Sequence, residues 1–160
     1  MTDTDNVAKL TELAKDIRIA MLTTVDADGS FISRPMAQQE VEPDGDLWFF
    51  AERSSSAVAH LAGNDHVGVT LSSSDTWISI NGTATVVEDV AKAKELWNSW
   101  VEAWLPQGPE DASVVLIKVD SESAEYWDTP GGRVASLLSF AKSKVTGERY
   151  EGGENETVQL

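Results

Sequence analysis

Short runs of apolar and β-branched residues, separated by turn sequences, dominate the first half of the chain and predict antiparallel β-strands. Residues 19–25 (IAMLTTV) form the first strand, and residues 30–41 (SFISRPMAQQEV) can return beside it after the turn DADG at residues 26–29. The turn EPDG at residues 42–45 then leads into a third strand at residues 46–52 (DLWFFAE). The sheet is therefore expected to begin with a hairpin and a third neighbouring strand.

Four later runs predict the rest of the sheet. Residues 66–73 (HVGVTLSS) and 76–89 (TWISINGTATVVED) have the composition of strands. The second run is long enough to need a bend or bulge, which the pair Asn81-Gly82 can supply. Residues 113–120 (SVVLIKVD) and 124–128 (AEYWD) are expected to be the last strands. The pattern thus predicts six or seven strands.

Apolar residues at helical spacing are confined to a few segments. Residues 5–17, behind a Thr- and Asp-rich start that can cap a helix, and residues 90–103 (VAKAKELWNSWVEA) predict two amphipathic helices. A shorter helix is expected to begin in the serine run of residues 54–64, and another within residues 129–147. The polar segment 148–160 (ERYEGGENETVQL) is expected to be frayed.

The order of these elements indicates the fold class. Helices are inserted between strands that can pair with their sequence neighbours, and regular βαβ alternation is missing. An α+β, mainly β fold with an antiparallel sheet or barrel is therefore expected. A length of 160 residues with 41% hydrophobic content suits one compact domain. We place this domain at residues 1–130 and a C-terminal helix with a polar tail at residues 131–160.

Charge and composition narrow the range of functions. The chain has 27 Asp and Glu against 12 Lys and Arg, a net charge of −15 that repels nucleic-acid phosphates and anionic lipid headgroups. Neither nucleic acid nor a membrane is therefore expected as a partner. The lack of cysteine excludes disulfides and thiolate chemistry. Because the start is not signal-like and no apolar run approaches about 20 residues, a cytoplasmic location is expected.

Residues for conventional side-chain catalysis are scarce in this sequence. The only histidines, His60 and His66, have no carboxylates at metal-ligand spacing around them, and a structural or solvent-exposed role is expected for both. The sequence also lacks a glycine-rich phosphate loop, a serine elbow and a convincing carboxylate pair. No metal site and no catalytic side chain is therefore predicted.

The placement of two arginines is more informative. Arg34 and Arg53 are the only bases between residues 19 and 91, where eleven acids lie. A phosphate-bearing ligand on these strands would have to use them, because the guanidinium group offers a planar fork of donors. Arg53 also precedes a serine run at the expected start of a helix, whose free N–H groups add donors. On these features alone, surface ion pairs remain the simpler explanation.

Six tryptophans are many for a core of this size. Three of them, Trp97, Trp100 and Trp104, share one broad face of the helix expected at residues 90–103. The others lie on or near predicted strands: Trp48, Trp77 and Trp127. Core packing or a dimer interface explains most tryptophans in proteins. Binding of a flat aromatic ligand is the alternative.

Four segments, by their order and spacing, resemble a known family. They are MLTTVDADGSFISRPM (21–36), DLWFFAERSS (46–55), HVGVTLSSSDTWISINGTATVVED (66–89) and LWNSWVEAWLPQGPEDASVVLIKVDSESAEYWD (96–128). From about residue 5 to residue 130 the chain resembles the pyridoxamine 5′-phosphate oxidase-like, FMN-binding split β-barrel superfamily, in the branch called general stress protein 26.

This resemblance implies a six-stranded antiparallel split β-barrel with peripheral helices. It further implies a side-by-side homodimer with two flavin sites in the grooves between the subunits. The residues that it places at the flavin fall into four groups. Beside the flavin lie Arg34, Pro35 and Met36; along its ring Trp48, Phe49 and Phe50; at its phosphate Arg53, Ser54, Ser55 and Ser56; and in the wall of the groove Trp97, Trp104 and Trp127.

One position departs from the family pattern. Relatives commonly carry a lysine shortly after the serine of the phosphate segment, whereas this chain has Ala57 before Val58. Loss of that ammonium removes a charge-assisted contact of about 1.5–3 kcal/mol, or roughly tenfold to a hundredfold in affinity. Weak binding, and purification without flavin, are therefore expected unless Arg53 and the serines compensate.

The resemblance implies a flavin-binding protein that uses FMN, with FAD or a deazaflavin as alternatives. The first hypothesis is a small oxidoreductase or flavin reductase, which exchanges electrons with a small-molecule donor or acceptor. The second is a non-catalytic protein that sequesters flavin. Oxidation of pyridoxamine phosphate ranks last, because the C-terminus RYEGGENETVQL lacks that enzyme's basic substrate-binding segment.

Overall fold

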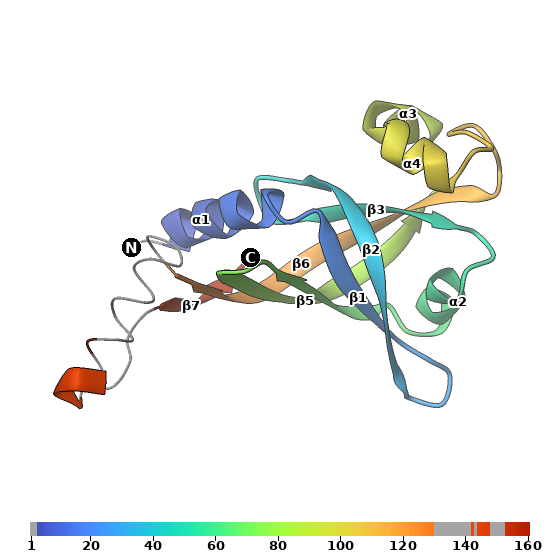
Figure 1. Ribbon diagram of the computed structural model, residues 1–160. Helices are drawn as coiled ribbons and strands as arrows, with labels where there is room; N and C mark the ends of the chain where they lie inside the picture. Colours follow the sequence, from blue (N-terminus) through green and yellow to red (C-terminus); the bar gives the residue numbers. More distant parts are fainter. Residues whose placement is uncertain (1–2, 130–141, 143, 148–152) are drawn as a thin grey trace.

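Seven antiparallel strands form one sheet in the computed structural model, which describes residues 3–129, 142, 144–147 and 153–160 (Figure 1). The strand order is β3-β2-β1-β4-β5-β6-β7, and β3 also pairs with β6. This last pairing closes β1 to β6 into a six-stranded barrel, which confirms the predicted fold class. The strands are β1 (Ile19–Val25), β2 (Phe31–Val41), β3 (Leu47–Glu52), β4 (His66–Ser72), β5 (Thr76–Val87), β6 (Val114–Asp128) and β7 (Glu154–Gln159).

Four helices lie around the barrel within residues 3–129 (Figure 1). They are α1 (Asp3–Lys15), α2 (Ser56–Gly63), α3 (Val90–Leu96) and α4 (Ser99–Trp104). The first helix packs against β2, β5 and β7, and α2 packs against β1, β3 and β5. In the described part of the chain, no helix is both long and apolar enough to cross a lipid bilayer.

The barrel is open on one side, between β2 and β3. The first half of β2, residues 31–37, pairs with β1 only, and β3 reaches β2 only through residues 38–41. Beyond that point the end of β3, residues 50–52, pairs with β6 alone. We call this opening, between residues 31–37 of β2 and residues 50–52 of β3, the split.

The predicted bulge in β5 is confirmed. The pairing of β5 with β6 shifts its register between Asn81 and Gly82. A Cβ atom on Gly82 would lie 2.1 Å from the backbone oxygen of Asp120, closer than any side chain tolerates. Only glycine therefore permits this close approach of the two backbones.

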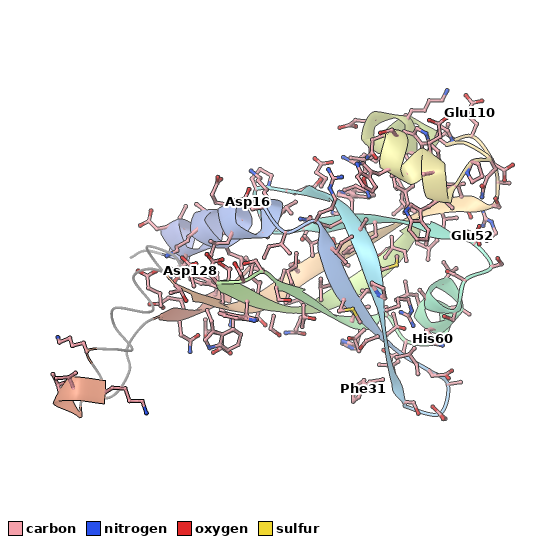
Figure 2. The ribbon with its side chains drawn as sticks, in the orientation of Figure 1. Asp16, Phe31, Glu52, His60, Glu110 and Asp128 are labelled. Atoms are coloured by element: carbon pink, nitrogen blue, oxygen red, sulfur yellow. The ribbon has the colours of Figure 1, made fainter. Side chains whose placement is uncertain are left out.

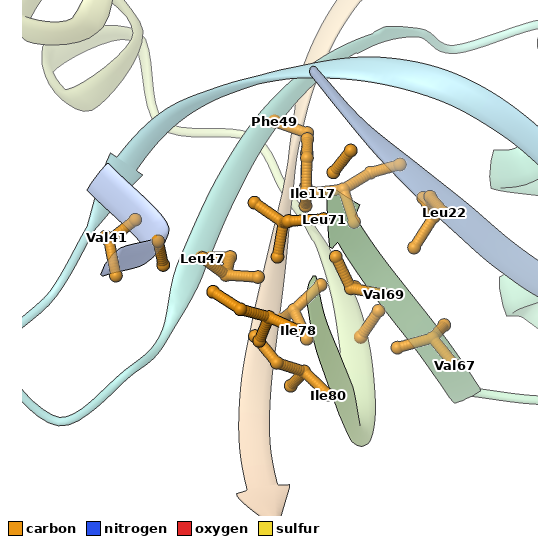
Figure 3. Packing of buried hydrophobic residues seen from close by; sticks show 14 of the residues in the cluster. Leu22, Val41, Leu47, Phe49, Val67, Val69, Leu71, Ile78, Ile80 and Ile117 are labelled. Atoms are coloured by element: carbon orange, nitrogen blue, oxygen red, sulfur yellow. The ribbon is translucent and has the colours of Figure 1, made fainter. Parts of the chain in front are cut away.

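Two hydrophobic clusters hold the structure together. The larger fills the barrel and includes Leu22, Phe49, Val69 and Ile117, which point toward one another in Figure 3. The smaller lies between the outside of β3 and β6 and the α3–α4 pair: Trp48, Phe50, Ala93, Val101, Leu105, Val114 and Leu116. Full burial of one large apolar side chain stabilises the fold by about 1.5–3 kcal/mol. The second cluster therefore fastens α3 and α4 to the barrel.

Two predicted boundaries are wrong. Residues 113–120 and 124–128 were expected to be two strands, but residues 114–128 form one continuous strand, β6, because β5 pairs with it from residue 116 to residue 128. The single helix expected at residues 90–103 is two helices, with Trp97 and Asn98 between them. The Asn98 side chain accepts hydrogen bonds from the N–H groups of Trp100 (3.0 Å) and Val101 (3.1 Å), and so starts a new helix.

The C-terminal segment also differs from its prediction. Fraying was expected over residues 148–160, but Glu154–Gln159 pair with β6 as β7. Val158 is buried in the barrel core, and Glu154 forms an ion pair with Lys9 of α1. These two contacts explain why a mostly polar segment is held on the sheet. The helix expected within residues 129–147 lies mostly outside the described residues.

Candidate functional site

Arg34 lies in the part of β2 that borders the split. Its partner in the β1–β2 register is Leu22, which is fully buried, and cross-strand partners share one face of a sheet. Arg34 therefore lies on the face of β2 that is directed into the barrel. Its Nη1 and Nη2 atoms are both buried and have no hydrogen-bond partner among the described residues.

This environment is unfavourable for a cation. Burial lowers the pKa of the Arg34 guanidinium from its usual value, although arginine stays protonated at any physiological pH. A buried donor without a partner costs about 1–3 kcal/mol, and more when it is charged. An anion that entered the split would recover this cost. Arg34 is therefore a candidate for binding an anion.

Arg53, just after β3, is in the opposite situation. It forms an ion pair with Glu88, and its Nε donates to the carbonyl oxygen of Ala112 (2.8 Å). The hydrogen bond between the two side chains raises the pKa of Arg53 and lowers that of Glu88. Arg53 also lines a cavity of about 290 Å³ together with four acids: Glu88, Asp89, Glu110 and Asp111. Its charge is already neutralised, and its surroundings repel phosphate.

The serine run lies between Arg53 and the first turn of α2. Ser55 is the N-cap residue, and its side-chain oxygen accepts a hydrogen bond from the N–H of Val58 (3.5 Å). Ser54 and Ser56 are exposed, and the first turn of α2 carries no acid. Free N–H groups and hydroxyls at a helix N-terminus favour an anion. The serines can therefore donate to a phosphate.

A polar contact joins the two sides of the split. His60 of α2 places Nδ1 2.8 Å from Oγ1 of Thr24 on β1 and Nε2 3.5 Å from Oδ1 of Asp26 in the β1–β2 turn. Thr24 is fully buried, and the His60 side chain is only 10% exposed. Figure 2 shows His60 between α2 and the β1–β2 hairpin. We call this contact the His60 bridge; it fixes α2 relative to the strand pair that carries Arg34.

The other residues expected at the flavin do not gather at one surface. Phe49 is inside the barrel, and Trp48 and Phe50 are buried in the smaller cluster. Trp97 packs edge to face on Phe50, with the ring centroids 5.3 Å apart. Trp104, the last residue of α4, is 81% exposed.

The remaining expected residues are divided between the two faces of the sheet. Met36 packs against the barrel core, and Pro35 is exposed on the outside, opposite Met21. Trp127 lies on the outside of β6, beside Trp77 of β5. Of the residues expected at the flavin, Arg34 lies in the β2 wall of the split, and Arg53 and the serines directly follow its β3 wall along the chain.

Ala57, which stands where relatives carry a lysine, is only 1% exposed and belongs to the barrel core. A lysine at this position would have to replace a core contact or extend from the core toward an anion. The structure therefore offers no second free cation in the first turn of α2.

Three carboxylates gather in the β2–β3 turn, at Glu42, Asp44 and Asp46, within 4.8 Å of one another. Lys118 of β6 lies 3.1 Å from Asp46 and 3.2 Å from Asp120. Hydrogen bonds to these two acids raise the pKa of Lys118. One ammonium group thus offsets part of the negative charge of this cluster, which the sequence presented only as a turn.

The sequence profile of the family described as "Pyridoxamine 5′-phosphate oxidase like" matches residues 5–151. The chain belongs to this family. The Protein bli-3 of Neurospora crassa is 29% identical over 143 residues, which cover 82% of this chain and 68% of that protein.

Solved structures of family members share the fold. A candidate general stress protein 26 from Jannaschia sp. CCS1 has a TM-score of 0.82 and 26% identity, over 98% of this chain and 99% of that one. General stress protein 26 of Bacillus anthracis has a TM-score of 0.67 and 26% identity, over 79% and 94%. A general stress FMN/FAD binding protein of Xanthomonas citri has a TM-score of 0.62 and 29% identity, over 79% and 87%.

Proposed function

We propose that this family member binds FMN, with the anionic end of the flavin at the split, and acts as a small flavin-dependent oxidoreductase. The observation that carries the proposal is the buried and unpartnered guanidinium group of Arg34. In a chain with a net charge of −15, acids are plentiful, and a guanidinium group whose buried donors have no partner is unfavourable unless an external anion binds to it. The FMN/FAD binding relative in Xanthomonas citri supports flavin as the ligand.

The residues along the split fit such a ligand. The two Nη groups of Arg34 can donate hydrogen bonds to two phosphate oxygens or to the oxygen of a flavin carbonyl. Ser54 and Ser56, with the N–H groups of the first α2 turn, supply neutral donors. Arg53 can contribute only if Glu88 releases it. This set predicts weaker binding than two free cations would give.

A bound flavin would supply the hydride and electron transfer, which the side chains do not. Arg34 would stabilise negative charge on the bound group, because it is held in a buried position without a competing acid. The His60 bridge would keep the serines at a fixed distance from Arg34. The Thr24–His60–Asp26 chain resembles a nucleophile triad, but Thr24 is fully buried and cannot reach a substrate.

We also propose that two chains associate through the outside of the barrel. Large apolar side chains project from the outer face of β1, β2, β5 and β6, and Phe31 projects from the hairpin in Figure 2. They are Ile19, Met21, Phe31, Trp77 and Trp127. An apolar surface of this kind is more typical of an interface than of a monomer. Sedimentation of a single species at 17.3 kDa would contradict this dimer.

Flavin binding is tested by titrating flavin fluorescence with the purified protein. The wild type is expected to quench FMN fluorescence saturably. Arg34→Gln is expected to bind FMN about tenfold or more weakly, because a charge-assisted hydrogen bond is lost. The matched control is Lys15→Gln, which removes one exposed charge at the C-terminal end of α1. Unchanged affinity in Arg34→Gln would remove Arg34 from the site.

Catalysis is tested separately, by anaerobic addition of NADH or NADPH to the reconstituted protein. Bleaching of the flavin followed by reoxidation with an acceptor supports an oxidoreductase. Bound flavin that is never reduced supports the alternative, a protein that sequesters flavin. That alternative is favoured by the lack of an accessible catalytic side chain among the described residues along the split.

A further inference from the structure

The ion pairs of the structure single out three cations. Eight Lys and Arg residues lie between positions 9 and 118, and five of them pair with an acid: Lys9, Arg53, Lys92, Lys94 and Lys118. Among the described residues, no carboxylate lies within ion-pair distance of Lys15, Arg18 or Arg34. In so acidic a chain, bases without an acid partner are candidates for binding an external anion. The proposed flavin site uses Arg34, which leaves Lys15 and Arg18.

These two remaining bases line the same cavity. A hollow of about 300 Å³ lies at the C-terminal end of α1, bordered by Lys15, Arg18 and the second half of β2. Its β2 residues are Gln38, Gln39, Glu40 and Val41. We call it the α1–β2 groove. It lies about four residues along β2 from Arg34, roughly 13 Å at the rise of a strand.

The walls of the α1–β2 groove are held firmly. The Gln38 amide side chain donates to the carbonyl oxygens of Ala14 (2.7 Å) and Ile17 (2.9 Å), and its backbone N–H donates to that of Arg18 (2.9 Å). These bonds fasten the end of α1 to β2. A ligand would therefore meet a largely preformed site, which lowers the entropic cost of binding.

The charge of the groove is positive although the chain is strongly acidic. Its only acid is Glu40, whose carboxylate lies 2.7 Å from Nζ of Lys92. The hydrogen bond to Glu40 raises the pKa of Lys92, so this ion pair persists at neutral pH. With Glu40 neutralised, Lys15 and Arg18 determine the local charge. The groove therefore favours an anion.

An exposed aromatic ring stands at the rim of the groove. The guanidinium carbon of Arg18 lies 5.6 Å from the ring centroid of Trp100, which is 65% exposed. The side chain of Asn98 donates to Oε1 of Gln39 (2.8 Å) and so ties the start of α4 to this part of β2. Tryptophan with a guanidinium group over its ring forms a platform on which flat groups can stack.

From these features we propose that the α1–β2 groove binds a small anion that carries one aromatic ring. The carboxylate or phosphate of this ligand pairs with Lys15 and Arg18, and its ring contacts Trp100. A volume of about 300 Å³ is at the lower end for ligand pockets and suits a single-ring molecule rather than a dinucleotide. The site is separate from the split, so it does not depend on flavin binding.

The test uses benzoate, phenyl phosphate, inorganic phosphate and benzyl alcohol as probes of the full-length protein. Calorimetry gives affinities, and the NMR signal of the Trp100 indole N–H, assigned with Trp100→Phe, reports the location. Either aromatic anion is expected to bind saturably with one site per chain and to shift this signal. Inorganic phosphate and benzyl alcohol are expected to bind at least fivefold more weakly, and the better aromatic anion identifies carboxylate or phosphate as the preferred group.

Matched variants separate a site from general charge effects. Arg18→Gln and Lys15→Gln are each expected to weaken the aromatic anion by about fivefold. Lys94→Gln, which removes the same charge elsewhere, should leave the affinity unchanged, and Arg18→Gln should leave FMN affinity unchanged. The proposal is overturned if neither aromatic anion shifts the Trp100 signal, or if Lys94→Gln weakens binding as much as Arg18→Gln.

Discussion

Arg34 lies in the β2 wall of the split and Arg53 directly follows the β3 wall along the chain, yet their surroundings are opposite. Arg34, on the β1–β2 hairpin, is half-buried, and its two Nη atoms are buried without a partner among the described residues. Arg53, at the start of the α2 segment, is exposed, paired with Glu88 and surrounded by further acids. From the sequence, Arg53 had the stronger case for binding a phosphate, because a serine run follows it. The structure separates a cation that a ligand could stabilise from one that the protein has already neutralised.

The difference shows how an anion site can exist in an acidic protein. An exposed ion pair contributes little to stability, and its main effect is to neutralise the charge of the cation. A buried donor without a partner is costly, and this cost is the part that a ligand can recover. The hairpin side of the split is therefore expected to dominate flavin affinity. The α2 side is expected to contribute mainly neutral donors.

The largest effect on stability is expected from removing the side-chain contact that joins the two sides of the split. His60→Ala removes the His60 bridge and leaves the buried Thr24 hydroxyl without its partner. A buried polar group left unsatisfied costs about 1–3 kcal/mol, so the free energy of unfolding should fall by about 2 kcal/mol. FMN affinity should also fall, because α2 loses its fixed position. Urea unfolding and FMN titration measure the two effects.

His66→Ala is the matched control for this variant. His66 is the only other histidine, and its side chain is exposed at the start of β4. Its replacement is expected to change stability by less than about 0.5 kcal/mol. If both variants lost the same stability, the His60 bridge would have no special role in joining the two sides.

A smaller effect of opposite sign is expected from Arg34→Met without flavin. Methionine keeps much of the length of arginine and removes the buried charge that lacks a partner. The apo protein should therefore be more stable by about 1 kcal/mol, while FMN binding is lost. Thermal unfolding with and without FMN measures both.

Arg53→Met is the matched comparison. It breaks an exposed ion pair and, unlike Arg34→Met, removes no buried charge. It should leave apo stability nearly unchanged and reduce FMN affinity much less than Arg34→Met does. Loss of apo stability in Arg34→Met would mean that Arg34 has a stabilising partner in the protein itself, and the argument for an anion there would fail.

Local patterns predicted the hairpin side of this comparison well. The apolar and β-branched runs within residues 19–41, the turn before Ser30 and the bulge at Asn81-Gly82 are set by neighbours along the chain or by one close backbone contact. The break between α3 and α4 was also visible in the sequence, because Asn98 is a strong N-cap residue. Three tryptophans at helical spacing concealed that signal.

Features that depend on distant contacts were not predictable. The segment ENETVQ becomes β7 because Val158 reaches the core and Glu154 reaches Lys9, and neither contact is encoded locally. Whether Arg34 or Arg53 has an acid partner likewise depends on which acids the barrel brings near each of them. Lys15 and Arg18 were missed because they precede the first strand, and only the fold places them beside Trp100.

The smallest predicted effect tests whether Arg53 can be recruited. Glu88→Gln removes the acid that holds Arg53 and lowers the negative charge around it. FMN affinity should rise by about two- to threefold, as expected for one partly exposed charge. The matched control is Glu110→Gln, which removes an acid from the same cavity but breaks the pair with Lys94 instead.

The outcome shows which groups on the α2 side of the split contribute to FMN binding. If Glu88→Gln strengthens FMN binding and Glu110→Gln does not, Arg53 becomes a second cation once it is released. If both variants strengthen it equally, only the overall charge of the cavity matters. If neither has an effect, the α2 side acts through its serines and helix N–H groups, and Arg34 alone supplies the positive charge.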